Sequence, residues 1–391
     1  MEMWFFGSPN MIVFGEEALE YLREIEGKRI FIVTGRTVTR LGLLDIVLEQ
    51  IRETGMESRV FSEVEPEPSK QTVEKGAAAI TEFAPDWILG LGGGSNIDAA
   101  KAMWVLYERP DLTLEDINPF MKLGLRKKAR MIAVPTTSGT GAEANWATII
   151  TDKENQVKLE LASREIVPDI AILDPLLTLD LPSRQTADTG VDALVHAIEA
   201  YTSQWKNDFS DAFALKAINS IMRYLPRAFQ KGRSDPEARE KMHNAATMAG
   251  MAFGNSQAGL VHAMAHSLGP VFNIPHGRCV AVVLPYVMEY NLGQATKMYS
   301  EIAWSLGNNA EADEDKARAL IDMVRMLLRE VGEPPSLKEY GITDNDFAAR
   351  LDELVEKAKE SACSTTSCRV PVDDDCRRLF LYVQAGKQVD F

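Results

Sequence analysis

The chain has 391 residues, 46% of them hydrophobic and 25% charged, which is typical of a globular protein with a sizeable core. Its 57 acidic and 42 basic residues give a net charge of −15, which argues against a nucleic-acid partner because phosphate backbones require a basic surface. We also find no apolar segment long enough for a membrane span, no signal-peptide pattern, and too few cysteines for a disulfide framework. We therefore expect a cytoplasmic protein.

The first half of the chain alternates β-branched segments with helical ones. Strands are predicted at 29–34, 58–61, 86–91 and 131–135, and helices at 41–54, 69–83 and 96–107. Such alternation is typical of parallel βαβ units in a doubly wound sheet. From residue 183 onward, Ala, Leu, Met and Glu recur at helical spacing and no alternating strand is found. We predict an α/β domain over 1–182, an all-α domain over 183–391, and a ligand in the cleft between them.

Two loops follow predicted strands. Gly90–Ser95 leads into a helix, where glycines allow close approach of a ligand and the helix dipole favours an anion such as a pyrophosphate. Ser95 is the expected N-cap of that helix, paired with Asp98. The loop at 135–143 offers hydroxyls and backbone donors for a phosphate or ribose. Either loop could equally be a structural turn.

Four of the five histidines fall in two short segments. Asp192 and His196 are four residues apart, so a helix places them on one face, and His262 and His266 repeat this spacing. His276 follows, beyond a helix break expected at Pro270. This clustering favours a metal site over chance packing of single histidines.

Two other groups of residues are interpreted as structural. His243 lies in a polar helical segment and is expected at the surface. Cys363, Cys368 and Cys376 lack the close Cys-x2-Cys pair of a zinc site.

Four motifs, in this order, resemble the iron-containing (group III) alcohol dehydrogenases. They are Gly-Gly-Gly-Ser-x-x-Asp-x-Ala-Lys at 92–101, Pro-Thr-Thr-x-Gly-Thr-Gly at 135–141, Gly-Val-Asp-Ala-Leu-x-His-Ala-Ile-Glu at 190–199, and His-x3-His-x9-His at 262–276. The similarity runs from about residue 4 to about residue 300 and continues more weakly to the C-terminus. The resemblance implies a dinucleotide-binding α/β domain followed by an all-helical, metal-binding domain.

The resemblance also implies roles for individual residues. The metal ligands would be Asp192, His196, His262 and His276, while His266 would lie near the nicotinamide and the substrate. The cofactor would be held by Gly92, Gly93, Gly94, Ser95 and Asp98 at its pyrophosphate, lined by Thr136, Thr137 and Thr140, and reached at its ribose by Lys158. Members are usually homodimers or larger, often pairing through N-terminal strands, and the apolar runs at 3–6 and 11–14 suit that pairing.

Three imidazoles and one carboxylate would leave a coordination position open for a substrate oxygen, as in catalytic sites. The metal would act there as a Lewis acid, and His266 is our candidate for relaying the alcohol proton to solvent. The resemblance implies Fe2+, although Zn2+ outcompetes Fe2+ at such mixed sites and would be found in purified protein as well.

The sequence departs from the family pattern beside the cofactor ribose. Gly35 stands where NAD-preferring members carry an aspartate, and Arg36 next to it would attract a 2′-phosphate. Glu67 opposes this, because a carboxylate there would accept from a 2′-hydroxyl. We predict NADP over NAD, since the charge and bidentate argument is the heavier one.

The predicted substrate pocket is apolar and narrow, with Trp146, Phe253 and Cys363 as its candidate residues. It favours a small primary alcohol, diol or aldehyde. Alternatives are a zinc-dependent glycerol dehydrogenase, a lyase of the dehydroquinate synthase type, and a non-catalytic protein that keeps the fold.

Overall fold

The computed structural model describes residues 5–155, 157–372 and 374–391, and the chain separates into two compact units between Asp180 and Leu181. The boundary predicted from the sequence follows residue 182. Residues 3 and 4 of the N-terminal apolar run lie outside the described residues.

The N-terminal unit contains a six-stranded sheet in the order β1-β8-β5-β4-β2-β3, and all neighbouring strands are parallel. The sheet strands are β1 Met11–Phe14, β2 Arg29–Gly35, β3 Glu57–Val64, β4 Trp87–Gly92, β5 Arg130–Pro135 and β8 Ile170–Leu173. The helices of this unit are α1 Arg36–Arg40, α2 Leu43–Thr54, α3 Lys70–Phe83 and α4 Gly94–Glu108, with 3-10 turns η1 Ala18–Glu24, η2 Leu114–Asp116, η3 Arg164–Ile166 and η4 Pro175–Thr178. The predicted parallel α/β sheet is confirmed.

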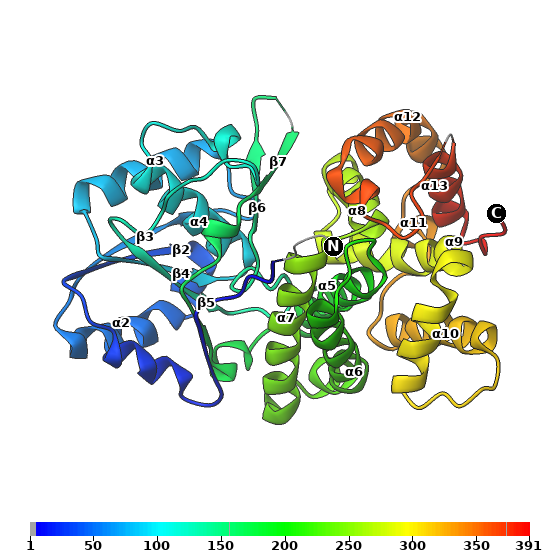
Figure 1. Cartoon of the computed structure of the whole chain (residues 1–391), viewed down its shortest axis with the longest axis horizontal. Coiled ribbons are helices and arrows are strands. Elements are labelled where there is room, and N and C mark those ends of the chain that lie inside the picture. Colours follow the sequence, from blue (N-terminus) through cyan, green and yellow to red (C-terminus); the bar gives the residue numbers. More distant parts are fainter. Residues whose placement is uncertain (1–4, 156, 373) are drawn as a thin grey trace. The chain divides into compact units, whose positions relative to one another are not determined.

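Helices cover both faces of this sheet, with α2 on one side and α3 and α4 on the other (Figure 1). The alternation of side chains along β2 explains the arrangement, because successive residues of a strand point to opposite faces. Ile30 and Ile32 join the core beneath η1 and α2, whereas Phe31 and Val33 join the core beneath α3 and α4. A strand buried on both faces reads as a continuous apolar run, as the sequence does here.

The chain leaves β2 and β4 toward opposite faces, since α1 and α2 follow β2 and α4 follows β4. Their neighbouring carboxyl ends therefore form a topological switch point, the place where open α/β sheets bind ligands. Gly35 ends β2 and Gly92 ends β4, so the structure puts two sequence-predicted cofactor residues at this point.

An antiparallel hairpin, β6 Ala147–Asp152 and β7 Val157–Ala162, forms a separate two-stranded sheet that the sequence analysis did not predict. Asp98 of α4 holds it in place, because its carbonyl accepts from the Thr148 hydroxyl and its carboxylate accepts from Ile149 N–H.

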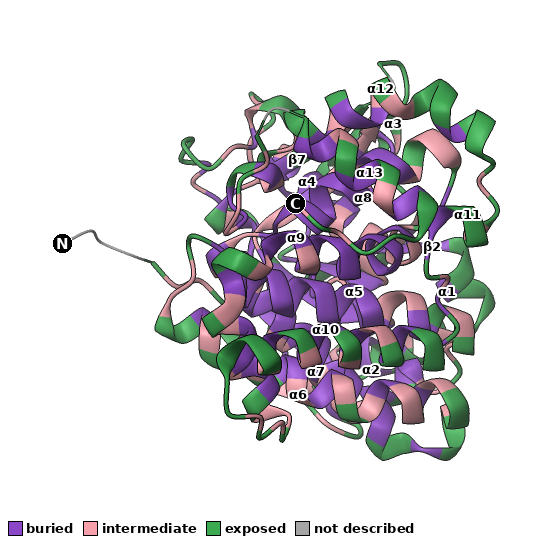
Figure 2. Ribbon diagram, turned by 90° about the vertical axis from the view of Figure 1, so that its right-hand side faces the viewer, coloured by how far each residue is buried: buried purple, intermediate pink, exposed green. Residues whose placement is uncertain are grey.

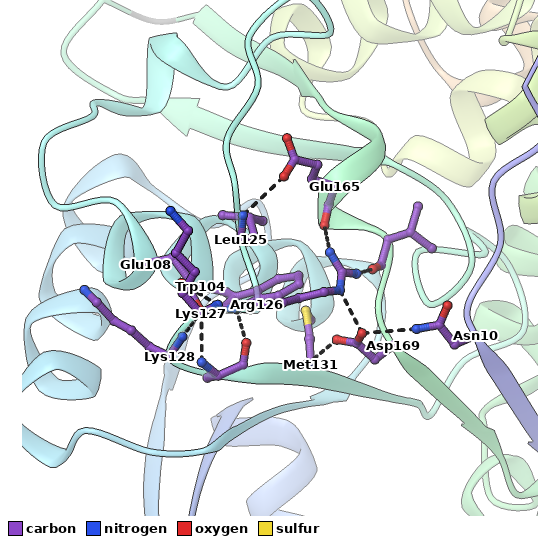
Figure 3. Close-up of polar contacts among 12 residues, drawn as sticks. Asn10, Trp104, Glu108, Leu125, Arg126, Lys127, Lys128, Met131, Glu165 and Asp169 are labelled. Atoms are coloured by element: carbon purple, nitrogen blue, oxygen red, sulfur yellow. Dashed lines mark hydrogen bonds and ion pairs between the residues drawn. The ribbon is translucent and has the colours of Figure 1, made fainter.

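Three carboxylates, two of them buried, hold the loop between α4 and β5 (Figure 3). Glu165 accepts from the backbone N–H groups of Leu123, Gly124 and Leu125, and Glu108 accepts from those of the residues at 127–129. Arg126 has a left-handed backbone (φ 68°) and ion-pairs with Asp169 at 2.7 Å. Its guanidinium also donates to the carbonyls of Glu165 and Val167.

We expect Arg126→Gly to lower the free energy of unfolding by about 2–3 kcal/mol, because glycine keeps the left-handed backbone while Asp169, 6% exposed, loses its cation. Urea denaturation measures the change. Lys122→Ala removes an exposed cation from the same loop and should change stability by less than about 0.5 kcal/mol. Equal stability of Arg126→Gly and wild type would show that the ion pair is not structural.

The described part of the C-terminal unit is helical, as predicted. Its helices are α5 Ser183–Thr202, α6 Asp208–Lys231, α7 Pro236–Ser256, α8 Leu260–Phe272, α9 His276–Ser305, α10 Asp313–Glu330, α11 Leu337–Tyr340, α12 Asp344–Glu360 and α13 Asp375–Ala385, with 3-10 turns η5 Gly232–Ser234 and η6 Ala362–Thr365. Residues of α5 from Gly190 to Thr202 are buried all round, and α5 contacts α6, α7 and α9. Figure 2 shows this burial along α5 and α9, in contrast to the exposed face of α10. Among the described residues, we find no helix with the length and apolar character to cross a membrane.

Candidate active site

Three helices bring the four candidate metal ligands together inside the C-terminal unit. Asp192 and His196 lie one turn apart on α5, His262 lies in the first turn of α8, and His276 is the first residue of α9. Asp192 and His196 therefore share one face of α5, as their spacing predicted, and the first turns of α8 and α9 supply the other two histidines.

One carboxylate oxygen is the centre of this cluster. Asp192 Oδ1 lies 3.7 Å from His196 Nδ1, 3.6 Å from His262 Nε2 and 3.4 Å from His276 Nε2. The ligand atoms of Asp192, His196 and His262 all lie within 4.8 Å of one another. These separations are too long for hydrogen bonds. They match the spacing of about 3.4 Å between ligands held at about 2.1 Å around a tetrahedral metal ion.

Burial supports the same interpretation. Asp192 is 2% exposed, and its Oδ1, His196 Nδ1 and His262 Nε2 are buried atoms without a hydrogen-bond partner. A buried polar atom without a partner costs about 1–3 kcal/mol, so three that face one another need a common partner. A divalent cation fits, because neutral imidazole and carboxylate are the ligands that iron and zinc take.

Charge and burial set the protonation of the cluster. Burial raises the pKa of Asp192, but the neighbouring histidines outweigh it and hold this pKa well below its ordinary value. Burial lowers the pKa of His196 to about 3 and also lowers the pKa of His276. Burial lowers the pKa of His262 as well, but Glu199 and Asp192 outweigh it and raise this pKa to about 10. The carboxylate and two of the imidazoles are therefore ready to bind a cation at neutral pH.

In the N-terminal unit, the glycine loop is shaped by close backbone approach. Gly92 has φ 139°, and a Cβ there would lie 1.9 Å from Asn96 Nδ2. A Cβ on Gly94 would lie 2.7 Å from Thr140 Cγ2, and one on Gly93 would lie 3.3 Å from Thr137 Oγ1. The glycine loop and the threonine loop at 135–143 thus pack directly on each other. No side chain caps α4, which leaves its N-terminus suited to an anionic group such as a pyrophosphate.

Two family descriptions match the chain. "Iron-containing alcohol dehydrogenase" matches residues 9–175, and "Fe-containing alcohol dehydrogenase family, C-terminal" matches residues 186–382. The chain belongs to the iron-containing alcohol dehydrogenase family. It is a metal-dependent alcohol dehydrogenase that uses NAD(P). These matches favour the dehydrogenase function over the lyase and non-catalytic alternatives.

Relatives of this family resemble the chain over its whole length. The NADPH-dependent butanol dehydrogenase of Clostridium saccharobutylicum is 41% identical and covers 99% of both chains. Among solved structures, a 1,3-propanediol oxidoreductase has a TM-score of 0.92 at 32% identity, covering 98% of this chain and 100% of that one. The iron-containing alcohol dehydrogenase of Thermococcus thioreducens has a TM-score of 0.89 at 35% identity, with the same coverage. The chain spans only 43% of the Escherichia coli bifunctional aldehyde-alcohol dehydrogenase, to which it is 39% identical.

The residues predicted beside the ribose lie near the switch point of this dehydrogenase's sheet. Gly35 is confined sterically, because a Cβ there would lie 2.6 Å from the carbonyl oxygen of Val64. Arg36 follows it at the start of α1 and is exposed. Glu67 has a left-handed backbone (φ 54°) and forms an ion pair with Lys158, whose Nζ lies 2.9 Å from Glu67 Oε1. The structure thus brings Glu67 and Lys158 together, so each partly neutralises the other.

Buried Lys101 joins α4 to the second loop, a role that the sequence analysis missed. Its Nζ donates to Asn145 O, Asn145 Oδ1 and Ala147 O at 2.9–3.1 Å, and burial lowers its pKa to about 8. Burial likewise raises the pKa of Asp98 to about 6. Thr136 is buried, and its N–H donates to Gly92 O. Lys101 lies within the quoted 92–101 motif, so the motif contained this signal.

The remaining predicted residues surround the histidine cluster or belong to the other unit. The ring of Phe253 stacks on His196 with centroids 4.2 Å apart. The ring of His266 lies 5.3 Å from that of His276, and a His266 nitrogen lies within 4.8 Å of Cys363 Sγ. Trp146 follows the second loop of the N-terminal unit and is half-buried.

Three local predictions were wrong. Gly93 is the N-cap of α4, so Ser95 lies inside the first turn, where its hydroxyl accepts from Glu67 N–H at 3.3 Å. Helix α8 runs through Pro270 and ends at Phe272, before Asn273 turns left-handed (φ 53°). His243 is 1% exposed because α7 packs against α5 and α6, and burial lowers its pKa to about 4.

We expect removal of metal by a chelator to destabilise the protein, because the facing polar atoms of the cluster lose their common partner. Re-adding Zn2+ or, anaerobically, Fe2+ at about 1,000 times the Kd should restore about 4 kcal/mol, or roughly 8–16 °C in Tm. Differential scanning calorimetry measures the shift. Mg2+, which prefers oxygen ligands, serves as the control. Identical Tm values for chelated and metal-loaded protein would exclude a metal at this cluster.

Proposed function

We propose that Asp192, His196, His262 and His276 bind one catalytic divalent metal ion, with Fe2+ as the working metal and Zn2+ as its competitor. The observation that carries this proposal is the convergence of three imidazole nitrogens at 3.4–3.7 Å on one buried carboxylate oxygen. When bound, the ion supplies Lewis-acid polarisation of the substrate oxygen during hydride transfer to or from the nicotinamide.

The chain's own residues prepare the site for this chemistry. Packing of Phe253 on His196 excludes water from one side of the cluster and fixes that imidazole ring. His266 stands on the same helix as His262, one turn further, within 5.9 Å of it centroid to centroid. Its ring also lies 5.3 Å from that of His276, centroid to centroid, so it is near the candidate ligands, and we assign it to moving the alcohol proton between substrate and solvent.

We expect His196→Ala and His276→Ala to lose bound metal and activity together, because each removes one of four ligands. His266→Ala should keep the metal while kcat falls by about 10²–10⁴-fold, the usual contribution of a general acid or base. Metal content by atomic emission and steady-state kinetics after anaerobic reconstitution distinguish these outcomes. An active, metal-free His196→Ala enzyme would refute the metal site, and full activity of His266→Ala would remove its assigned role.

We propose NADP as the preferred cofactor. Arg36 is an exposed cation at the carboxyl end of β2, suited to a 2′-phosphate. The Lys158 partner of Glu67 weakens the argument for NAD, because a paired carboxylate repels a phosphate less. The butanol dehydrogenase described above is itself NADPH-dependent. Gly35 supports neither cofactor strongly, since its steric confinement beside Val64 already explains it.

Arg36→Ala should raise KM for NADPH by on the order of 10- to 100-fold, the loss expected for a hydrogen bond between charged groups, and leave KM for NADH nearly unchanged. Arg40→Ala is the matched control, because Arg40 is an exposed arginine at the other end of α1. Initial rates with both cofactors at a fixed aldehyde concentration provide the measurement. A wild-type enzyme that turns over NADH faster than NADPH would contradict the proposed preference.

We propose a small primary alcohol, diol or aldehyde as substrate. Phe253 lies beside the candidate ligand His196 and Cys363 lies beside His266, and both side chains are apolar. The names of two relatives, a butanol dehydrogenase and a 1,3-propanediol oxidoreductase, point to the same size class. Anaerobic assays with a panel of short aldehydes, diols and sugars test the proposal, and a preference for sugars would overturn it.

We also propose a homodimer or a larger homo-oligomer. The β1 strand lies at the sheet edge and exposes Met11 and Phe14, 44% and 64% respectively, which suits pairing with another copy. Light scattering at several protein concentrations tests this proposal. The cytoplasmic location stays a prediction.

A further inference from the structure

Glu199 is a buried carboxylate behind the histidine cluster. It lies on α5 three residues after His196 and seven after Asp192, so all three point to one face of the helix. It is 6% exposed, and Oε2 lies 2.5 Å from His262 Nδ1. The opposite ring nitrogen of His262, Nε2, is the one that faces Asp192.

The second oxygen of Glu199 is used as well. Oε1 accepts from the backbone N–H of Val261 at 2.7 Å, in the first turn of α8. A negative charge at a helix N-terminus is favourable, so Glu199 fixes both the start of α8 and the ring of His262 that α8 carries. Gly259 makes this approach possible, because a Cβ there would lie 2.9 Å from Oε1.

We propose that Glu199 is a positioning residue: when the metal replaces the proton on Nε2 of His262, Glu199 keeps hydrogen on Nδ1 and the lone pair of Nε2 directed at the metal. This inference rests on the proposed metal site. A carboxylate has only acceptor oxygens, and both neighbours of Glu199 are donors in this arrangement, Val261 N–H and His262 Nδ1–H. The outer partner of a metal-binding histidine fixes its tautomer and ring orientation and raises its affinity for the metal.

Glu199→Gln tests this assignment with nearly unchanged shape. A glutamine has one acceptor oxygen and one donor NH2 group, so it cannot accept from both Val261 N–H and His262 Nδ1–H. Either a backbone N–H loses its partner, or the NH2 group donates to Nδ1 and forces hydrogen onto Nε2, where it blocks the metal. We expect the Kd for Co2+, measured by chelator competition, to rise about 10- to 100-fold. The visible spectrum of bound Co2+ should change at the same time.

Glu289→Gln is the matched control. Glu289 is also a buried carboxylate, and it accepts from Arg325 and from the backbone N–H of Val389. A merely structural effect of losing such a carboxylate would lower Tm in both variants, whereas only Glu199→Gln should change the Co2+ spectrum and Kd. Gly259→Ala is a second, independent variant, because its methyl group would displace Glu199 without changing the chemistry of the carboxylate.

The outcomes separate this inference from the metal site itself. If the wild-type protein binds no Co2+, the proposed metal site is wrong. If the wild type binds Co2+ and Glu199→Gln binds it with the same Kd and spectrum, the role of Glu199 is wrong. If Glu199→Gln fails to fold, Gly259→Ala decides by the same two measurements.

Discussion

The C-terminal unit is organised around one buried carboxylate oxygen, Asp192 Oδ1, and the three imidazole nitrogens that face it. Burying charges and polar atoms in a helical core costs free energy unless a partner compensates them. This arrangement is therefore favourable only when a cation compensates the facing polar atoms. It also requires three helices to approach closely. Small residues make that approach possible, since a Cβ on Gly277 of α9 would lie 2.2 Å from Asp188 O of α5, and one on Gly259 before α8 would lie 2.9 Å from Glu199 Oε1 of α5.

The N-terminal unit handles its ligand by a different physical means. Its candidate cofactor residues include glycines at the carboxyl end of β4, which let the glycine loop and the threonine loop pack against each other. Buried Lys101 adds a rigid connection between α4 and the second loop. In the proposed cofactor site, a backbone cradle would recognise the phosphates common to both nicotinamide cofactors. The choice between NADP and NAD would then fall to a few side chains at its edge, Arg36 and the Glu67–Lys158 pair among them.

Glu199 links the architecture of the helical unit to its chemistry. One side chain satisfies the first turn of α8 and orders a candidate ligand carried by the same turn. Preorganisation of this kind matters for catalysis, because a ligand ring that is already oriented needs no rearrangement when the ion binds. The stacking of Phe253 on His196 has a comparable effect on a second ligand.

The sequence by itself determined the family, the parallel α/β unit, the helical unit and the aspartate and histidines proposed as metal ligands. These follow from periodicity and from motifs that are local in the chain. Strand alternation around Ile30–Val33 and the four-residue spacing of Asp192 and His196 needed no tertiary information. The tertiary structure decided what depends on distant neighbours. The burial of His243 follows from the packing of α7, the confinement of Gly35 from the carbonyl of Val64, and the pairing of Glu67 with Lys158 joins residues 91 positions apart. Glu199 depends on both levels. Its helical spacing from Asp192 is visible in the sequence, but only the fold brings it to its partner His262, 63 residues away.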